Sequence, residues 1–257
     1  MLLSDLLTIL DRLAPLRYAE PWDNVGLLTG DPAAEIERAL CTIDLTHAVL
    51  DEALAAGARL VIAYHPPVFE GLKRVRHGSI LQRAIRADVA VWSPHTALDV
   101  APGGTNDMLA DAAGLVDRAP LKVTSVAEGV GIGRIGTLPS PRTRAEILDR
   151  IKRELHLSAL LVAGPREGLC ARVAMCAGAG RGLLDEAIAQ KADVYLTGEL
   201  PHHDALKAAA AGVTVACALH SNSERGTLPR LAKRLAAEAP EVTFTVSAAD
   251  RDPFVVA

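Results

Sequence analysis

Residues 39–64 read ALCTIDLTHAVLDEALAAGARLVIAY, and this stretch indicates the fold class. Its first part, 39–45, is a short apolar run typical of a buried strand, and its last part, 59–64, is a second one. Between them, 47–56 repeats its apolar residues at helical spacing. A strand, a helix and a strand in this order form a βαβ unit, so we expect an α/β protein with a parallel sheet covered by helices.

The same alternation continues along the rest of the chain. Helices are predicted over 2–13, 78–87, 105–114, 144–155, 181–190, 201–211 and 224–237, and strands over 89–93, 132–138, 159–163, 171–176, 193–197, 213–218 and 242–246. The pattern loosens over 117–130, where charged residues, proline and glycine interrupt it, and we place a boundary there. We therefore expect two α/β lobes, at about 1–122 and 123–257, with mainly parallel sheets flanked by helices.

The composition argues against one class of partner. The chain has 257 residues, of which 50% are hydrophobic and 3% aromatic, and its formal net charge is −4. A weakly acidic chain lacks the basic surface that binds a phosphate backbone, and it has few aromatic rings to stack on bases. Long nucleic acid is therefore disfavoured as a partner, whereas a single nucleotide is compatible with this composition.

The N-terminus and the cysteines point to the cytoplasm. Asp5 and Asp11 interrupt the first apolar run and no basic segment precedes it, so a signal peptide is not expected. No stretch reaches the roughly 18 apolar residues of a membrane-spanning helix, so no membrane is expected as a partner. The four cysteines, which lack CxxC spacing, are Cys41, Cys170, Cys176 and Cys217. We interpret them as reduced core residues, with a cysteine-based zinc site as the alternative.

Polar side chains follow four of the predicted strands. They are His65 after 59–64, His95 to Asp99 after 89–93, Glu199 to His203 after 193–197, and His220 to Glu224 after 213–218. Five of the eight histidines lie in these segments. Two of them, His202 and His203, open a predicted helix and could equally face solvent. Because ligands bind at the carboxyl ends of strands in open α/β sheets, we expect a functional site here.

Four of these residues form a donor set for a divalent cation. His65 and His220 offer imidazole nitrogens, and Asp99 and Glu224 offer carboxylate oxygens. This mixture suits zinc, manganese or iron. A cation with an open coordination position lowers the pKa of water toward neutrality, which is what a hydrolytic site requires. The sequence therefore predicts a site for one or two divalent cations per chain.

Each candidate ligand also has a purely structural interpretation. His65 could shape a turn, and Asp99 could accept hydrogen bonds from the amides of its loop. Ser221 to Glu224 matches the capping-box pattern as well as Thr143 to Glu146 does. His220 could be an ordinary polar residue at a strand end. The gathering of these residues at neighbouring strand ends favours metal binding over the separate interpretations.

A glycine-rich run, Gly178-Ala-Gly-Arg-Gly182, lies between the strand predicted over 171–176 and the next helix. It could hold an anion at that helix N-terminus. A tight strand-to-helix turn is the alternative, and it is the one that we expect.

At these residues the sequence resembles the GTP cyclohydrolase I type 2 homologues, also called NGG-one-interacting-factor-three-like proteins. The resemblance covers essentially the whole chain, which is taken as a single family domain over 1–257. The motifs that carry it are Glu20-Pro-Trp22-Asp23-Asn24-Val-Gly26, His65-Pro-Pro-Val-Phe69, Ser93-Pro-His95-Thr96-Ala-Leu-Asp99, Gly103-Gly-Thr-Asn106-Asp107, Thr197-Gly-Glu199 with His203, and His220-Ser-Asn-Ser-Glu224-Arg225.

The resemblance implies a two-lobed α/β fold assembled as a toroidal homohexamer, a trimer of dimers, with a dinuclear metal centre. Carried over by position, His65 and Asp99 would hold one cation, His220 the second, and Glu224 would touch both. Residues implied to line the pocket are Trp22, Tyr64, His95, Glu199 and His203. Many bacterial members have two consecutive histidines where this chain has Tyr64-His65, and a protonated phenol is a poor ligand, so one cation or two are expected.

The resemblance also implies an enzyme, a metal-dependent hydrolase of a nucleotide-like small molecule. In GTP ring opening, His95 or Glu199 would move protons while formate leaves. Lys73, Arg74 and Arg76 are candidates to contact a triphosphate, although a solvated basic loop explains them equally well. The alternative function is non-enzymatic: a metal-handling protein, or a regulatory or adaptor scaffold.

Overall fold

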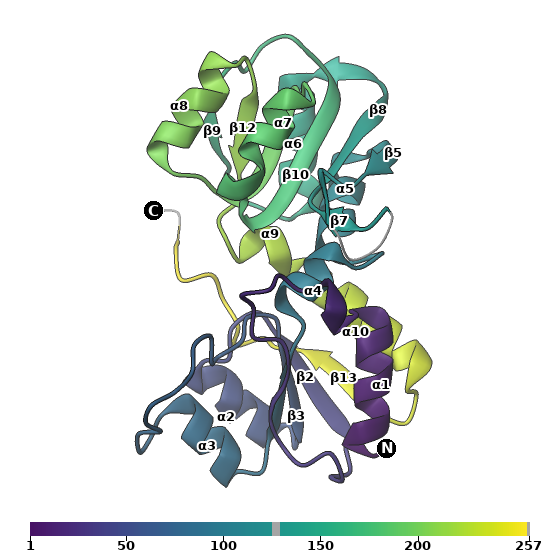
Figure 1. Cartoon of the computed structure of the whole chain (residues 1–257), viewed down its shortest axis with the longest axis vertical. Helices are drawn as coiled ribbons and strands as arrows, with labels where there is room; N and C mark the ends of the chain where they lie inside the picture. The colour runs from purple at the N-terminus through teal and green to yellow at the C-terminus, as the bar shows by residue number, and fades with distance from the viewer. Residues whose placement is uncertain (125–128, 256–257) are drawn as a thin grey trace. The chain divides into compact units, whose positions relative to one another are not determined.

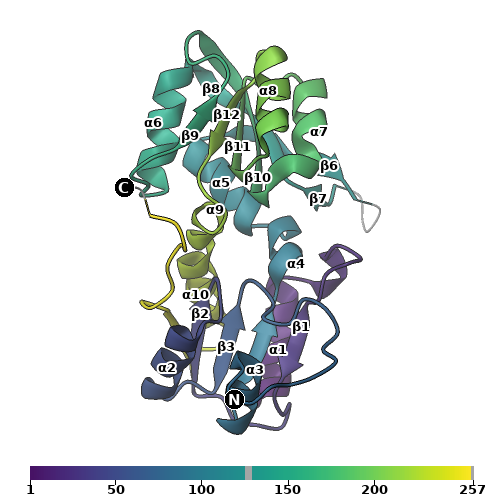
Figure 2. The ribbon, with the colours of Figure 1, turned by 90° about the vertical axis from the view of Figure 1, so that its left-hand side faces the viewer.

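A computed structural model describes residues 1–124 and 129–255 of the chain (Figures 1 and 2). By the packing of its elements the chain divides into two compact units. Unit 1 contains Met1–Ala101 and Thr227–Arg251, and unit 2 contains Pro102–Gly226 together with the chain from Asp252 onward. The chain therefore passes from one unit to the other three times.

Unit 1 is built on a five-stranded sheet in the order β1-β4-β3-β2-β13. The strands are β1 (Gly26–Thr29), β2 (Arg38–Thr42), β3 (Leu60–Ala63), β4 (Ala90–Ser93) and β13 (Thr243–Val246). The pairs β2–β3, β3–β4 and β13–β2 are parallel, and only the edge strand β1 runs antiparallel to its neighbour. The βαβ unit predicted from residues 39–64 is confirmed by the register, which places Ala39 opposite Leu60.

Helices cover both faces of this sheet because its strands are apolar on both sides (Figure 1). One face packs against α1 (Leu3–Leu13) and α10 (Thr227–Glu238), and the other packs against α2 (His47–Ala55) and α3 (Ile80–Arg86). Alternate residues of each strand point to opposite faces, so Cys41, Ile62 and Trp92 join the first core. Leu40, Val61 and Val91 join the second.

Unit 2 is built on a six-stranded sheet in the order β5-β8-β10-β11-β12-β9. The strands are β5 (Val116–Ala119), β8 (Arg134–Thr143), β9 (Leu161–Ala163), β10 (Leu169–Ala179), β11 (Val194–Glu199) and β12 (Thr214–Cys217). A two-stranded ribbon, β6 (Lys122–Val123) with β7 (Gly131–Ile132), lies outside this sheet. Among the described strands of this sheet, only β10–β11 and β11–β12 pair in parallel. The second sheet is therefore mixed, with parallel strands at its centre and antiparallel pairs toward its edges.

The helices of unit 2 also cover both faces of their sheet (Figure 2). One face packs against α5 (Thr105–Ala113) and α6 (Arg144–Glu154), and the other packs against α7 (Leu184–Ala189) and α8 (His202–Ala210). The predicted capping box at the start of α6 is confirmed. The Thr143 hydroxyl accepts from the Glu146 amide at 3.2 Å, and the Glu146 carboxylate accepts from the Thr143 amide at 2.7 Å.

The lobes predicted at about 1–122 and 123–257 divide the chain at one point, whereas the packing units interleave. The amphipathic helix α10 explains why, since Leu228, Leu231 and Leu235 belong to the same core as α1. Part of the predicted boundary, 125–128, lies outside the described residues. Within the described residues, no helix combines the length and the apolar character needed to cross a membrane.

Candidate metal centre

In unit 1, the two residues after β3 continue its pairing with β2. The Tyr64 amide donates to the carbonyl of Thr42 at 2.9 Å, and the His65 amide donates to that of Ile43 at 3.0 Å. His65 therefore lies at the carboxyl end of a central parallel strand, where ligand-binding residues gather in α/β sheets. Its Nδ1 lies 3.0 Å from Oδ1 of Asp44, which follows the neighbouring strand β2. A proton on Nδ1 places the lone pair of the ring on Nε2.

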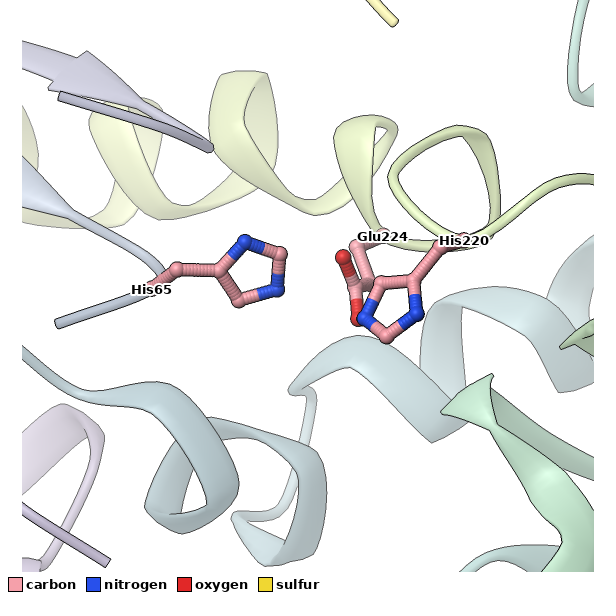
Figure 3. A group of neighbouring side chains, drawn as sticks. All are labelled: His65, His220 and Glu224. Atoms are coloured by element: carbon pink, nitrogen blue, oxygen red, sulfur yellow. The ribbon is translucent and has the colours of Figure 1, made fainter. Parts of the chain in front are cut away.

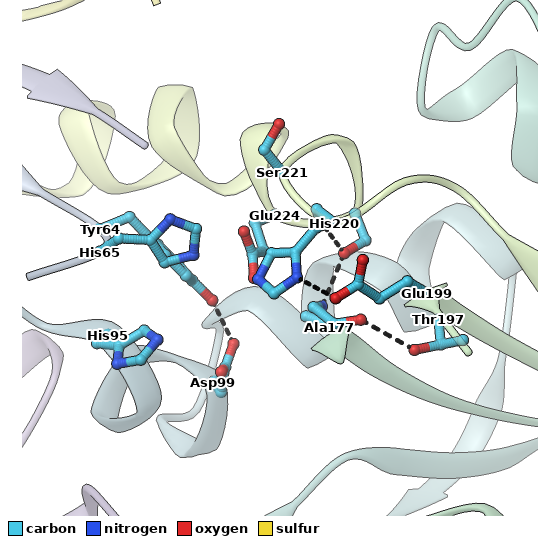
Figure 4. A network of polar contacts seen from close by, with 12 residues as sticks. Tyr64, His65, His95, Asp99, Ala177, Thr197, Glu199, His220, Ser221 and Glu224 are labelled. Carbon is cyan, nitrogen blue, oxygen red and sulfur yellow. Dashed lines mark hydrogen bonds and ion pairs between the residues drawn. The ribbon is translucent and has the colours of Figure 1, made fainter. Parts of the chain in front are cut away.

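Asp99 lies on a helix and not in the loop that the sequence suggested. The segment after β4 folds as α4 (His95–Val100), and Asp99 is 8% exposed near its end. The hydroxyl of Tyr64 donates a hydrogen bond to Asp99 Oδ1 (Figure 4). Tyr64 itself is 1% exposed, so both partners are buried within unit 1. A buried carboxylate is costly to desolvate, and this hydrogen bond offsets part of that cost.

His95 opens α4 and is held by Asp23. Its Nδ1 lies 2.7 Å from Asp23 Oδ1, and the other oxygen of Asp23 accepts from the amide of Thr96 at 3.1 Å. Burial acts to raise the pKa of Asp23, but the hydrogen bonds from His95 and Thr96 outweigh it and hold this pKa below its usual value. Asp23 thus remains ionised and fixes the orientation of His95. From the sequence alone, Asp23 is recognised only as part of a motif, and no role was predicted for it.

The ring of His95 lies near several other aromatic rings of unit 1. The His65 and His95 ring centroids lie 5.4 Å apart, and those of Tyr64 and His65 lie 5.3 Å apart. Trp22 is 59% exposed, and its ring lies 5.7 Å from Phe69 and 6.1 Å from His95. Of the residues expected to line a pocket, Trp22, Tyr64 and His95 are therefore brought together.

In unit 2, His220 and Glu224 lie side by side (Figure 3). His220 follows β12, and Glu224 is on the short helix α9 (Asn222–Arg225), where it is 3% exposed. Nε2 of His220 lies 3.4 Å from Oε1 of Glu224. Nδ1 of His220 lies 3.0 Å from Oε1 of Glu199, the last residue of β11 (Figure 4). The ring thus contacts one carboxylate with each nitrogen.

The capping-box interpretation of Glu224 is wrong. Ser221 already has helical dihedral angles, φ −65° and ψ −26°, and its side chain makes no cap hydrogen bond. Its hydroxyl instead donates to Asp252 at 2.7 Å. A capping box needs an extended residue whose side chain turns back to the third amide, which is the conformation of Thr143 and not of Ser221. Glu224 is therefore not part of a cap.

Gly178 has no side chain, and this leaves space for the side chains of His220 and Glu224. Its φ is +63°, and a Cβ placed on it would lie 2.7 Å from Oε1 of Glu224 and 3.2 Å from Nε2 of His220. Ser223 holds this arrangement, because its hydroxyl accepts from the Gly178 amide at 2.8 Å and donates to the His220 carbonyl at 2.7 Å. The glycine run that starts here continues into a 3-10 turn over Gly180–Leu183 before α7, so it is a strand-to-helix turn.

These contacts fit a divalent cation. Imidazole nitrogen and carboxylate oxygen are borderline-to-hard donors, and His220 and Glu224 present one of each within a small space that no side chain from residue 178 enters. They form part of a His/Glu group that could hold a metal ion. Among residues 1–124 and 129–255, no cysteine belongs to such a group. Cys41, Cys170 and Cys176 are buried and Cys217 is half-buried, and none of these four described residues forms a disulfide.

The remaining predicted residues lie on exposed segments. His202 and His203 are exposed at the start of α8, where their rings lie 5.3 Å apart. Lys73, Arg74 and Arg76 are exposed on the segment between β3 and α3.

The fold and these side chains define a class: a two-unit α/β protein that carries histidine and carboxylate side chains at the carboxyl ends of parallel strands. The model of the Duf34/NIF3 (NGG1p interacting factor 3) family matches residues 1–253, and the chain belongs to this family. A NIF3-like protein 1 from Drosophila melanogaster is 40% identical, over 96% of this chain and 86% of that protein. A protein from Clostridium perfringens called GTP cyclohydrolase 1 type 2 homolog is 30% identical over 99% of both chains.

Solved structures have the same fold. A Bacillus cereus protein described as related to NIF3 superposes with a TM-score of 0.94 over 100% of this chain and 99% of that one, at 22% identity. A Staphylococcus aureus hypothetical protein superposes with a TM-score of 0.90, at 28% identity over 100% of this chain and 99% of that one. The mixed α/β fold and the family resemblance predicted from the sequence are thus confirmed.

Proposed function

We propose that the protein binds divalent metal and is a metal-dependent hydrolase of a nucleotide-like small molecule. The observation that carries the proposal is the contact of His220 with Glu224 beside Gly178, because it places a nitrogen and an oxygen donor close together. His65 and Asp99 are the proposed ligands in unit 1, and His220 and Glu224 those in unit 2. We expect zinc, manganese or iron, one or two cations per chain.

The contacts that each proposed ligand makes within its own unit support its assignment. His65 has its Nδ1 against Asp44, and His220 has its Nδ1 against Glu199, so each ring can present Nε2. Asp99 and Glu224 are buried at 8% and 3% exposure, which is costly for a carboxylate unless a cation or hydrogen bonds compensate it. A bound divalent cation would supply Lewis acidity and make water more acidic at the site.

His95 is the proposed group that moves a proton. Asp23 fixes its orientation through Nδ1, which leaves Nε2 as the nitrogen that can accept or donate a proton. Glu199 is the second predicted proton-moving residue, and Trp22, Tyr64 and His203 are the proposed pocket residues. A guanine nucleotide is the first substrate to try, since the Clostridium perfringens relative is called a GTP cyclohydrolase 1 type 2 homolog. A cytoplasmic homohexamer remains part of this proposal.

The first test is metal content per chain, measured by elemental analysis on the wild-type protein and on Glu224→Ala. We expect the wild type to retain metal after dialysis and the variant to lose it. Glu154→Ala, which removes an exposed carboxylate paired with Arg153 on α6, is the control and should retain metal. A wild type that takes up no zinc, manganese or iron would overturn the proposal of metal binding.

The second test is turnover. Metal-loaded protein should release formate from GTP with saturable kinetics, and His95→Ala should lose this activity while keeping its metal. A metal-loaded wild type that shows no turnover would favour the alternative function, a metal-handling protein or an adaptor. The name of one relative is consistent with an adaptor. This Saccharomyces cerevisiae protein is called NGG1-interacting factor 3, and it is 32% identical over 99% of this chain and 97% of that protein.

A further inference from the structure

The two histidines proposed as ligands are held in the same way in separate units. Nδ1 of His65 lies 3.0 Å from a carboxylate oxygen of Asp44, and Nδ1 of His220 lies 3.0 Å from one of Glu199. In each case the histidine follows one parallel strand, and the carboxylate lies at the carboxyl end of the strand beside it in the sheet. His65 and Asp44 follow the paired strands β3 and β2, whereas His220 follows β12 and Glu199 ends β11.

This repeated arrangement has a chemical consequence for the imidazole. A neutral ring carries its proton on one nitrogen only, and the carboxylate that accepts from Nδ1 decides which one. Nε2 then bears the lone pair, which is the nitrogen that can bind a cation. The carboxylate also limits rotation of the ring and increases its basicity as a ligand.

We propose that Asp44 and Glu199 are positioning residues that fix His65 and His220 in the tautomer that binds metal through Nε2. This inference rests on the proposed metal-binding function and deepens it. It gives a role to Asp44, which the sequence did not single out, and it gives Glu199 a role through His220. The side chains of Asp44 and Glu199 are 42% and 56% exposed. Exposed ion pairs contribute little to stability, so their loss should change metal binding more than folding.

The test is zinc affinity by competition with a chromophoric chelator, for Asp44→Asn and Glu199→Gln in the full chain. We expect zinc to bind about 10 to 100 times more weakly in each variant, with the same number of sites at saturation. The thermal unfolding midpoint of the metal-free protein should stay unchanged. Asp51→Asn and Glu154→Gln are matched controls, because these carboxylates pair with Arg83 and Arg153 and contact no proposed ligand.

A second measurement separates this inference from the proposed function. Nitrogen-15 NMR of the imidazoles at pH 8, on metal-free protein, reports which ring nitrogen carries the proton. We expect His220 to be protonated on Nδ1 in the wild type and to shift toward Nε2 protonation in Glu199→Gln. Unchanged tautomers together with unchanged zinc affinity would overturn the inference. A wild type that binds no zinc would overturn the proposed function, whereas a tautomer shift in Glu199→Gln would still support the positioning role.

Discussion

The Tyr64 hydroxyl donates a hydrogen bond to Oδ1 of Asp99, and both side chains are buried in unit 1. Asp99 is a proposed metal ligand, and Tyr64 directly precedes another proposed ligand, His65. If Asp99 binds a cation as proposed, this hydrogen bond would reduce the electron density that Oδ1 can offer it. The stability of this pair can be measured without metal.

Tyr64→Phe should lower the free energy of unfolding by about 1.5–3 kcal/mol, the range for a hydrogen bond to a charged group. Chemical denaturation of the metal-free protein measures it. Tyr195→Phe is the control, since that buried hydroxyl donates to the neutral carbonyl of Gly180 at 2.6 Å. Its loss should cost about 0.5–1.5 kcal/mol. Equal losses in the two variants would contradict a stronger hydrogen bond from Tyr64 to Asp99 than from Tyr195 to Gly180.

Gly178→Ala should weaken zinc binding. The new methyl group would displace Glu224 and His220, and moving a side chain off its preferred rotamer costs about 0.5–1.5 kcal/mol, which is up to about tenfold in affinity. Backbone strain at φ +63° should cost about 1–2 kcal/mol of stability in addition. The measurement is zinc affinity by chelator competition, with unfolding recorded in parallel.

Gly212→Ala separates these two effects. Gly212 has a φ of +77°, but a Cβ there would meet no atom within 4 Å. This variant should lose stability like Gly178→Ala while binding zinc as the wild type does. If both variants bound zinc equally well, Gly178 would have no role in leaving space for the ligands.

Glu52 should make the stability of the fold depend on pH. Burial acts to raise its pKa, but hydrogen bonds from the Ser247 hydroxyl and from the amides of Ala248 and Ala249 hold the pKa below its ordinary value of 4.5. Because the folded pKa is the lower one, ionised Glu52 stabilises the fold above pH 4.5, and this contribution is lost as pH falls through the folded value.

Urea unfolding of wild type and Glu52→Gln across pH measures this effect. The wild type should be the more stable at pH 7, and the difference should shrink steadily below about pH 4.5, the ordinary value for this carboxyl. A difference that stays constant from pH 7 to pH 3 would show that the Glu52 charge does not contribute.

The cysteines should be unreactive in the native protein. Burial raises the pKa of Cys41 and of Cys170 to about 12 and that of Cys217 to about 11, and Cys176 is 5% exposed. Since the thiolate is the reactive form, a disulfide reagent at pH 8 should label none of the four thiols within minutes. All four should react after unfolding in guanidinium. A rapidly labelled thiol in the native protein would contradict the assignment of the cysteines to the core.

The sequence predicted well the helices with one apolar face and the strands that are apolar throughout. The helix over 47–56 shows helical periodicity and the run over 59–64 is continuously apolar, so their burial follows from the sequence directly. The direction of β8 could not be read in this way, because an apolar run has the same pattern whether its neighbour is parallel or antiparallel. The mixed second sheet therefore emerged only from the structure.

The candidate site was predictable in its residue types but not in its supporting contacts. Histidines and carboxylates at strand ends are visible in the sequence, whereas the partners Asp44 of His65 and Asp23 of His95 depend on the register and turns that bring distant segments together. The Ser221–Glu224 pattern misled for the same reason. The local sequence matches a helix N-terminal capping box, but Ser221 instead contacts Asp252, which is 31 residues further along the chain.

The interleaving of the two units sets an order for folding during synthesis. Unit 2 takes almost all of its residues from one continuous segment, Pro102–Gly226, so its sheet can form as soon as that segment has left the ribosome. Unit 1 begins first and finishes last, because α10 must cover the apolar face beside α1 and β13 must pair with β2. The part of this core that α10 covers therefore stays open to solvent until unit 2 has been synthesised.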